Sequence, residues 1–176
     1  VFLSDYPVEI LNPFQVEEIA FVMLRDKPYL YKKLLQDGYA DFSFFLDDNT
    51  RFRVNIFSRQ KTYNIIMRKL ESKVKSIEEL SLPQIFYKIA NEKFGIVLVT
   101  GATGQGKTTS LAAILHEINK SEPVHILTLE DPIEYIHEPI RATINQRELG
   151  TDFSNYAEGL RAALREAPHV ILVGEI

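Results

Sequence analysis

The clearest chemistry in this chain belongs to a glycine-rich run that ends in a lysine and a threonine. Gly101, Gly106, Lys107 and Thr108 occupy the fixed positions of the pattern G-x-x-x-x-G-K-[ST]. Glycines let a backbone close around phosphate oxygens, and the start of a following helix adds the positive end of its dipole. Lys107 is suited to reach the β- and γ-phosphates, and the Thr108 hydroxyl is suited to ligate Mg²⁺. The run therefore predicts a binding site for a nucleoside triphosphate.

The flanking residues predict the elements that such a run requires. The apolar residues 96–99 predict a buried strand before it, and apolar residues at helical spacing over 111–118 predict a helix after it. A glycine-rich turn beside a surface lysine is the alternative interpretation, and this strand and helix context argues against it. The residues expected to bind the nucleotide are Gly101, Ala102, Thr103, Gly104, Gln105, Gly106, Lys107, Thr108 and Thr109.

Carboxylates follow two further apolar runs, 124–129 and 170–173, both of which predict buried strands. The acids are Glu130, Asp131 and Glu134 after the first run and Glu175 after the second. In open α/β sheets ligands bind at the carboxyl ends of the strands, where an acid can hold Mg²⁺ or orient water. An ordinary loop and an ordinary strand end are the alternatives, and the nearby glycine-rich run favours a functional role for both groups.

The first half of the chain predicts a small α+β unit in which helices pack on an antiparallel sheet. Asn12, Pro13 and Gln15 form a helix-start signal, and Gly38 is placed to end a second helix. The expected elements are helices over 13–25 and 28–36 and strands over 40–46, 51–59 and 63–70. After the glycine-rich run, Ser154 is expected to cap a helix that turns Ala157, Leu160, Ala163 and Leu164 inward.

Three arginines stand on the polar faces of the expected strands. Alternation places Arg51 and Arg53 on one face of their strand and Arg68 near the end of the next. The residues alone favour a solvated face for these side chains.

Composition limits the class of protein. Of 176 residues, 45% are hydrophobic, which is enough for a packed core. A net charge of −4 disfavours a nucleic-acid binder, which is usually basic. The absence of cysteine excludes disulfides and thiolate metal sites. No apolar run approaches the ~20 residues that span a bilayer, and residues 1–5, which lack an initiator Met, are typical of a fragment start rather than a signal peptide.

Together these stretches resemble the type II/IV secretion ATPase superfamily, and within it most closely the ATPases of type IV pilus retraction, or twitching motility. The matching stretches are 51–55, 95–109, 126–134, 145–148, 160–166 and 171–175. The resemblance implies a PAS-like α+β domain over 1–74, a linker over 75–82 and a RecA-like α/β P-loop domain over 83–176.

The resemblance also implies roles for the residues named above. It identifies Glu130, Asp131 and Glu134 as an aspartate box, in which Glu134 polarises the attacking water. It implies that Glu175 is the Walker B acid near Mg²⁺, which Thr108 also ligates. Arg53 and Arg68 correspond to arginines that stabilise charge on the γ-phosphate, so the catalytic set it implies is Glu134, Glu175, Arg53 and Arg68.

The implied protein is a cytoplasmic homohexamer that hydrolyses ATP with Mg²⁺ and acts at the inner membrane, peripherally, on a pilus platform protein. No nucleic-acid partner is expected. Two alternatives remain open: a pilus-extension or type II secretion assembly ATPase, and a regulatory or scaffold module that binds nucleotide without turnover.

The chain departs from the family pattern in three places. Ala102 and Gln105 replace Pro and Ser, and residues 167–169 read Ala-Pro-His where Asp-Pro-Asp is usual. The histidine box and C-terminal helices are expected beyond residue 176, and the first strands before residue 1. The segment by itself is therefore expected to hydrolyse ATP weakly.

Overall fold

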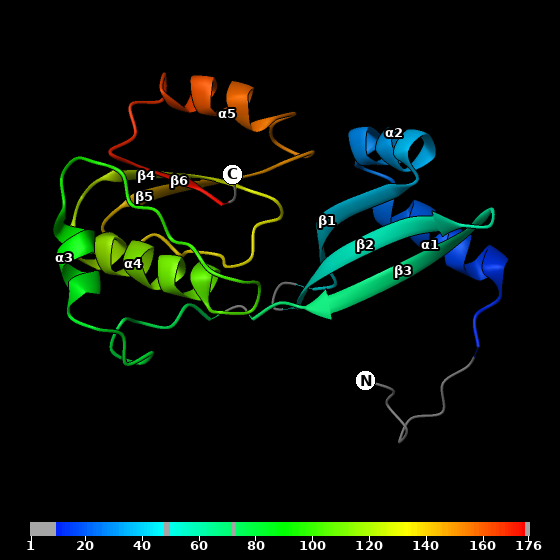
Figure 1. Ribbon diagram of the computed structural model, residues 1–176. Coiled ribbons are helices and arrows are strands. Elements are labelled where there is room, and N and C mark those ends of the chain that lie inside the picture. The colour runs from blue at the N-terminus through cyan, green and yellow to red at the C-terminus, as the bar shows by residue number, and fades with distance from the viewer. Residues whose placement is uncertain (1–9, 48–49, 72, 175–176) are drawn as a thin grey trace.

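The computed structural model describes residues 10–47, 50–71 and 73–174, which form an α/β fold with two lobes (Figure 1). We call residues 10–70 the N-terminal lobe and residues 85–174 the C-terminal lobe. Each contains one three-stranded sheet.

The N-terminal lobe packs two helices on an antiparallel meander of order β1-β2-β3. Its elements are α1 (Pro13–Leu24), α2 (Pro28–Asp37), β1 (Tyr39–Phe45), β2 (Arg51–Arg59) and β3 (Thr62–Lys69). The predicted helix start is confirmed, because Asn12 and Gln15 exchange both hydrogen bonds of a capping box. Gly38, in the left-handed region at φ 83°, ends α2 as expected. The predicted strands agree with these bounds to within one residue.

The core of this lobe lies between the sheet and the two helices. Phe42, Val54 and Ile56 from the sheet are fully buried against Leu24 and Leu34 from the helices. Because side chains alternate along a strand, the opposite face of the sheet carries polar residues. Ser43 on β1 and Arg51 on β2 belong to that face.

The C-terminal lobe has a parallel sheet of order β5-β4-β6. Its elements are α3 (Ile85–Asn91), α4 (Lys107–Ser121), β4 (His125–Glu130), β5 (Thr143–Glu148), α5 (Tyr156–Ala163) and β6 (Val170–Val173). Helices α3 and α4 cover one face of the sheet and α5 covers the other (Figure 1). On β4, Ile126 packs toward α4, whereas Leu127 and Leu129 pack toward α5.

The predicted strand over 96–99 is wrong. The segment is irregular, and Ile96 and Leu98 are 89% and 73% exposed. An apolar run becomes a strand only where a neighbouring strand supplies backbone partners. Among the described residues, the segment pairs with neither edge strand of the sheet, β5 or β6.

The helix near residue 160 exists and Ala163 is buried as expected, but the predicted cap and the other predicted inward residues are wrong. The side chain of Asn155, not Ser154, accepts the hydrogen bond of the capping position. Gly159 and Ala163 are buried, whereas the expected inward residues Ala157, Leu160 and Leu164 are exposed. The ring of Phe153 lies 2.9 Å from where a Cβ of Gly159 would stand, so the ring fills the space against this helix face.

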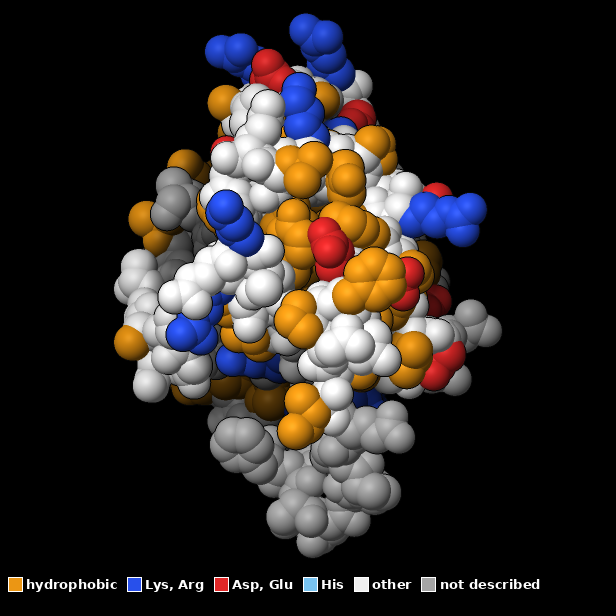
Figure 2. Space-filling model, turned by 90° about the vertical axis from the view of Figure 1, so that its right-hand side faces the viewer, with side chains coloured by type: hydrophobic (Ala, Val, Ile, Leu, Met, Phe, Trp, Pro, Cys, Tyr) orange, Lys and Arg blue, Asp and Glu red, His pale blue; other side chains and the backbone are white. Residues whose placement is uncertain are grey.

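The surface of the molecule is mixed in character. On the face drawn in Figure 2, hydrophobic side chains lie between charged ones. Helices α1 and α2 contribute exposed apolar residues, among them Phe14, Val22 and Leu35. Among the described residues, no helix combines the length and apolar character needed to cross a membrane.

Candidate active site

The predicted glycine-rich run, which we call the phosphate loop (residues 101–109), leads into α4 at Lys107. Gly104 and Gly106 have φ values of 80° and 79°, a region that side chains disfavour. The Lys107 ammonium donates to the carbonyl oxygens of Gly101 at 2.9 Å and Ala102 at 3.0 Å. The lysine is therefore folded back over its own loop, with its charge where an anionic ligand of the loop would meet it.

A second loop follows β4, and we call residues 130–137, which begin with the last residue of β4, the acidic loop. It contains the predicted acids Glu130, Asp131 and Glu134. Its side chains reach α4, where the hydroxyls of Tyr135 and Thr109 lie 3.1 Å apart. The structure thus brings the acidic loop beside the first turn of the phosphate-loop helix.

The first two of these acids are sheltered and the third is open. Glu130 is 7% exposed, and its Oε1 accepts hydrogen bonds from Thr128 at 2.6 Å and Gln146 at 3.2 Å. Burial raises the pKa of Glu130, and these hydrogen bonds oppose the rise. Asp131 is half-buried, whereas Glu134 is exposed.

Residues of β5 hold the acidic loop from the side. Gln146 donates to the carbonyl oxygen of Tyr135 at 2.8 Å and accepts from the His137 amide at 2.8 Å. Two residues farther along the same face, Glu148 is 4% exposed and accepts from the Ile133 amide at 3.2 Å. In the parallel register Glu148 stands directly opposite Glu130.

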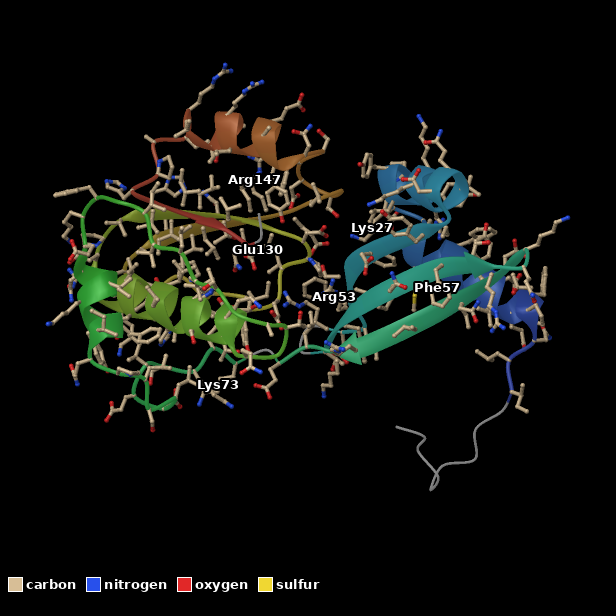
Figure 3. All side chains as sticks on the ribbon, viewed as in Figure 1. Lys27, Arg53, Phe57, Lys73, Glu130 and Arg147 are labelled. Carbon is tan, nitrogen blue, oxygen red and sulfur yellow. The ribbon has the colours of Figure 1, made fainter. Side chains whose placement is uncertain are left out.

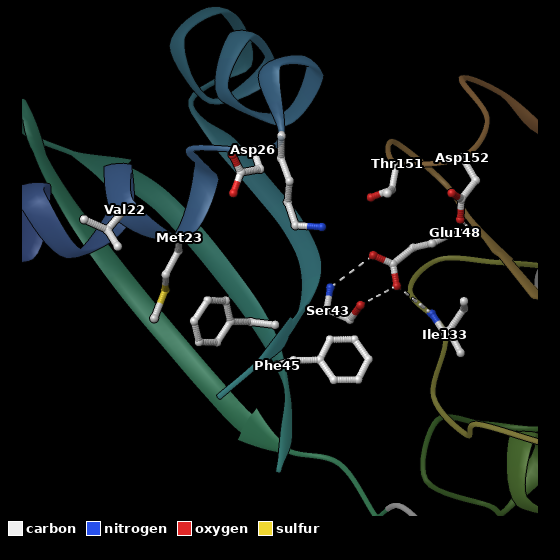
Figure 4. Close-up of a pocket in the computed structure, with 11 residues that line it drawn as sticks. Val22, Met23, Asp26, Ser43, Phe45, Ile133, Glu148, Thr151 and Asp152 are labelled. Atoms are coloured by element: carbon white, nitrogen blue, oxygen red, sulfur yellow. Dashed lines mark hydrogen bonds between the residues drawn. The ribbon is translucent and has the colours of Figure 1, made fainter. Parts of the chain in front are cut away.

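The N-terminal lobe reaches the same carboxylate. The Ser43 amide donates to Oε1 of Glu148 at 3.2 Å, and the Ser43 hydroxyl donates to Oε2 at 2.7 Å (Figure 4). Beside these contacts lies a cleft of about 340 Å³ between the lobes, lined in part by Met23, Lys27 and Asp152. The two lobes therefore meet at the carboxyl edge of the parallel sheet.

Arg51 is a second connection between the lobes. Its guanidinium donates to the carbonyl oxygen of Glu134 and is only 6% exposed. Burial lowers the pKa of Arg51, while the charges of Glu148, Glu130 and Glu134 raise it. The expectation that Arg51 lies on a solvated face is wrong, because its position at the start of β2 places it in the interface between the lobes.

The predicted arginines Arg53 and Arg68 are exposed and stand directly opposite each other on β2 and β3. Figure 3 shows Arg53 at the end of β2 nearer the C-terminal lobe. Among the described residues, no hydrogen bond joins either arginine to the phosphate loop. Like charges in direct opposition destabilise a sheet, so this pair has a cost that an anionic ligand would remove.

The predicted Walker B acid, Glu175, lies outside the described residues. The strand before it is confirmed: β6 pairs with β4 in parallel, and the Gly174 amide donates to the carbonyl oxygen of Leu129 at 2.8 Å.

Sequence reasoning missed the residues that hold the acidic loop: Ser43, Tyr135, Gln146 and Glu148. Glu148 belongs to a stretch that resembles the family, but β5 has no apolar run to mark it as a strand. The position of Glu148 directly opposite Glu130 would have identified it as a residue of the site. That position is known only once the order of the strands is known.

The chain is similar to known proteins over most of its length. The family model for type II/IV secretion system proteins matches residues 15–176. The chain is 47% identical over 158 residues to a twitching motility protein of Neisseria gonorrhoeae, covering 90% of this chain and 41% of that protein. It is 42% identical over 163 residues to the type IV pilus retraction ATPase PilT of Pseudomonas aeruginosa, covering 92% of this chain and 46% of that one.

A solved structure is also similar. The crystal structure of the pilus retraction motor PilT with bound ADP superposes with a TM-score of 0.88 at 39% identity, covering 100% of this chain and 50% of that one. The chain therefore spans half the length of these relatives or less. The family match extends over nearly the whole chain, which therefore belongs to the type II/IV secretion system protein family.

Proposed function

We propose that this chain is part of an ATP-hydrolysing motor subunit that powers type IV pilus retraction. The observation that carries the proposal is the similarity of fold and sequence to a retraction motor with bound ADP, in a chain whose Lys107 is folded over an intact phosphate loop. In this proposal the C-terminal lobe is an incomplete RecA-like P-loop domain and the N-terminal lobe a PAS-like domain. Their bounds are 83–176 and 1–74, with a linker over 75–82.

The residues of the phosphate loop fit a nucleotide. Its glycines leave the backbone free to approach phosphate oxygens, and Lys107 supplies a cation that can exchange its two carbonyl partners for them. Mg²⁺, when bound, would neutralise phosphate charge, and the Thr108 hydroxyl and the Glu175 carboxylate would hold it.

The acidic loop supplies the second half of the chemistry. Glu134 is exposed at the loop, so its carboxylate can accept a hydrogen bond from an attacking water and orient it. Arg53 and Arg68 would stabilise charge that develops on the γ-phosphate, a contribution of ~10³–10⁵ in rate for arginines in this role. The Arg53→Ala substitution should lower turnover more than ATP affinity.

The full-length protein would act as a cytoplasmic homohexamer, peripheral to the inner membrane, and would transmit domain movement to a pilus platform protein. A nucleic-acid partner is not part of the proposal.

Phosphate release by the full-length protein tests the enzymatic part. The Lys107→Ala substitution should abolish ATP turnover, because it removes the cation of the phosphate loop. Lys120→Ala is the matched control, since Lys120 is exposed at the last turn of the same helix. Turnover that persists in the Lys107 variant would contradict the proposal. ATP binding without turnover in the parent would favour a regulatory or scaffold module.

A cellular assay separates retraction from extension. Cells that carry the Lys107→Ala protein should keep surface pili but lose twitching, because pili are assembled and not withdrawn. Loss of surface pili would indicate a pilus-extension ATPase instead, and loss of secreted protein a type II secretion ATPase.

A further inference from the structure

We propose that Glu148 is a positioning residue that keeps the acidic loop in its reactive shape while the N-terminal lobe is docked. The inference rests on the proposed function, since it assigns a role to a residue that acts through the catalytic acid Glu134. It goes further by naming the contact through which movement between the lobes would control the chemistry.

Glu148 bonds to both lobes with one carboxylate. Among the described residues, three groups donate a hydrogen bond to it: the Ser43 amide and hydroxyl on β1 and the Ile133 amide in the acidic loop. The Ser43 hydroxyl and the Ile133 amide share the same oxygen, Oε2. Glu148 is only 4% exposed. Water can therefore replace a lost donor only after solvent has entered the interface between the lobes.

Arg51 provides a parallel connection one residue farther along the loop. Glu148 holds the amide of Ile133, and Arg51 holds the carbonyl of Glu134. The peptide unit between Ile133 and Glu134 is thus held on one side by a residue of β5 and on the other by a residue of the N-terminal lobe. Separation of the lobes removes the Arg51 contact and two of the three donors to Glu148 together.

The fit of the lobes elsewhere shows that they dock closely. Gly150, two residues after Glu148, has φ 82°, and a Cβ built on it would lie 3.0 Å from Leu30 Cδ2 and 3.4 Å from the Tyr29 ring. Helix α2 therefore rests on the turn that follows β5. A shift of the N-terminal lobe would change the surroundings of β5 at both Gly150 and Glu148.

The consequence is a coupling between docking and chemistry. With the lobes together, a buried carboxylate has all its hydrogen-bond partners and Glu134 is held on both sides. With the lobes apart, Glu148 is solvated, and the acidic loop loses the contact that fixes the backbone of Glu134. Water orientation by Glu134 would then be restricted to the docked arrangement.

Two substitutions of Ser43 of nearly the same shape test the proposal in the full-length protein. Ser43→Thr keeps a hydroxyl for Glu148, whereas Ser43→Val has the same shape as Thr without it. We expect Ser43→Val to lower kcat by about 10-fold, as loss of one hydrogen bond to a charged group implies. We expect Ser43→Thr to stay within about twofold of the parent, and KM for ATP to be unchanged in both.

Amide hydrogen exchange gives a readout that does not depend on turnover. Exchange of the segment that contains Ile133 should be faster in Ser43→Val than in Ser43→Thr by at least about fivefold. A role limited to holding the lobes together would change exchange in β1 and leave the acidic loop unaffected. Equal exchange of the acidic loop in the two variants would overturn the proposal.

Glu148→Gln tests the carboxylate itself. The NH₂ group of the glutamine side chain would face either the Ile133 amide or the Ser43 amide. Both groups are donors, so one of these hydrogen bonds is lost. We expect a decrease in kcat at least as large as that of Ser43→Val and faster exchange around Ile133. A Glu148→Gln protein with the parent's kcat and exchange would also overturn the proposal.

The Lys107→Ala protein separates this inference from the proposed function. If the parent hydrolyses ATP and the Lys107 variant does not, the proposed function stands, and the Ser43 pair alone decides the role of Glu148. If the parent shows no turnover, the proposed function fails and the positioning role fails with it.

Discussion

The lysine of the phosphate loop is held by residues of that loop, whereas the acidic loop is held by residues from three other elements. Lys107 bonds to carbonyls five and six positions earlier in the chain. The acidic loop bonds to Gln146 and Glu148 on β5, to Thr109 on α4 and to Arg51 on β2. The contacts of Lys107 are local in the chain, whereas the acidic loop depends on the tertiary fold.

This difference separates binding from reaction. Under the proposed function, contacts as local as those of Lys107 would let the phosphate loop hold nucleotide in different arrangements of the lobes. The position of Glu134, in contrast, would change when β5 or the N-terminal lobe moves, so that the reactive step could be controlled without loss of the ligand. Four predictions test this contrast, from the largest expected effect to the smallest.

The Gln146→Leu substitution should disrupt the acidic loop most strongly. It leaves the His137 amide and the Tyr135 carbonyl without their partner, and each unpaired buried group costs about 1–3 kcal/mol. We expect the free energy of unfolding in urea to fall by about 3 kcal/mol. Asn145→Leu is the control, because Asn145 is exposed and contributes one side-chain bond, to His125. Equal losses in the two variants would show that Gln146 does not hold the loop.

Acid should weaken the same loop through His137. Burial, together with the positive charge of His116, lowers the pKa of His137 from its ordinary 6.5 to about 4. Between these pH values the unfolded chain binds a proton that the folded chain does not, so stability is complete above about pH 6.5 and is lost as the pH falls toward 4. The loss amounts to roughly 3 kcal/mol at about 1.4 kcal/mol per pH unit.

Urea unfolding at several pH values checks this expectation. Between pH 6.5 and 4 the His137→Leu protein should lose less stability than the parent. The control is His169→Gln, because His169 is exposed, and this variant should lose as much stability as the parent. A parent profile that does not change between pH 6.5 and 4 would contradict the burial of a neutral His137.

The phosphate loop should respond to a purely local change. In Gly106→Val a β-branched residue must adopt φ 79°, although an added Cβ meets no atom within 4 Å. Backbone strain of about 1–3 kcal/mol predicts ATP binding weaker by about 10- to 100-fold. Gly38→Val imposes the same strain at φ 83° in the N-terminal lobe and should leave ATP affinity unchanged. Equal affinities for ATP in the two variants would refute a local requirement at Gly106.

The smallest expected effect concerns the opposed arginines. Because Arg53 and Arg68 face each other across β2 and β3, Arg68→Gln should raise the stability of the protein by about 0.5 kcal/mol while it lowers turnover. Lys69→Gln, on the same strand opposite Phe52, is the control and should change neither quantity appreciably. A gain in stability without any loss of turnover would count against a catalytic role for Arg68.

Local signals predicted much of the fold. The capping box of α1, the glycine that ends α2 and the alternation of β2 involve residues close in the sequence, so the chain alone identifies them. The strand predicted over 96–99 failed for the opposite reason. Apolar residues indicate that a segment can be buried, but a strand also requires a neighbour, and strand order is a long-range property.

The same division applies to the candidate site. The sequence by itself predicted the phosphate loop, because its glycines, lysine and threonine at fixed spacing act through backbone geometry within nine residues. It also predicted the acids at and after the end of β4. That Glu148 stands opposite Glu130, and that Ser43, 105 residues away along the chain, bonds to it, follows only from the tertiary structure. Such partners meet through sheet register and lobe docking, which no local pattern of residues encodes.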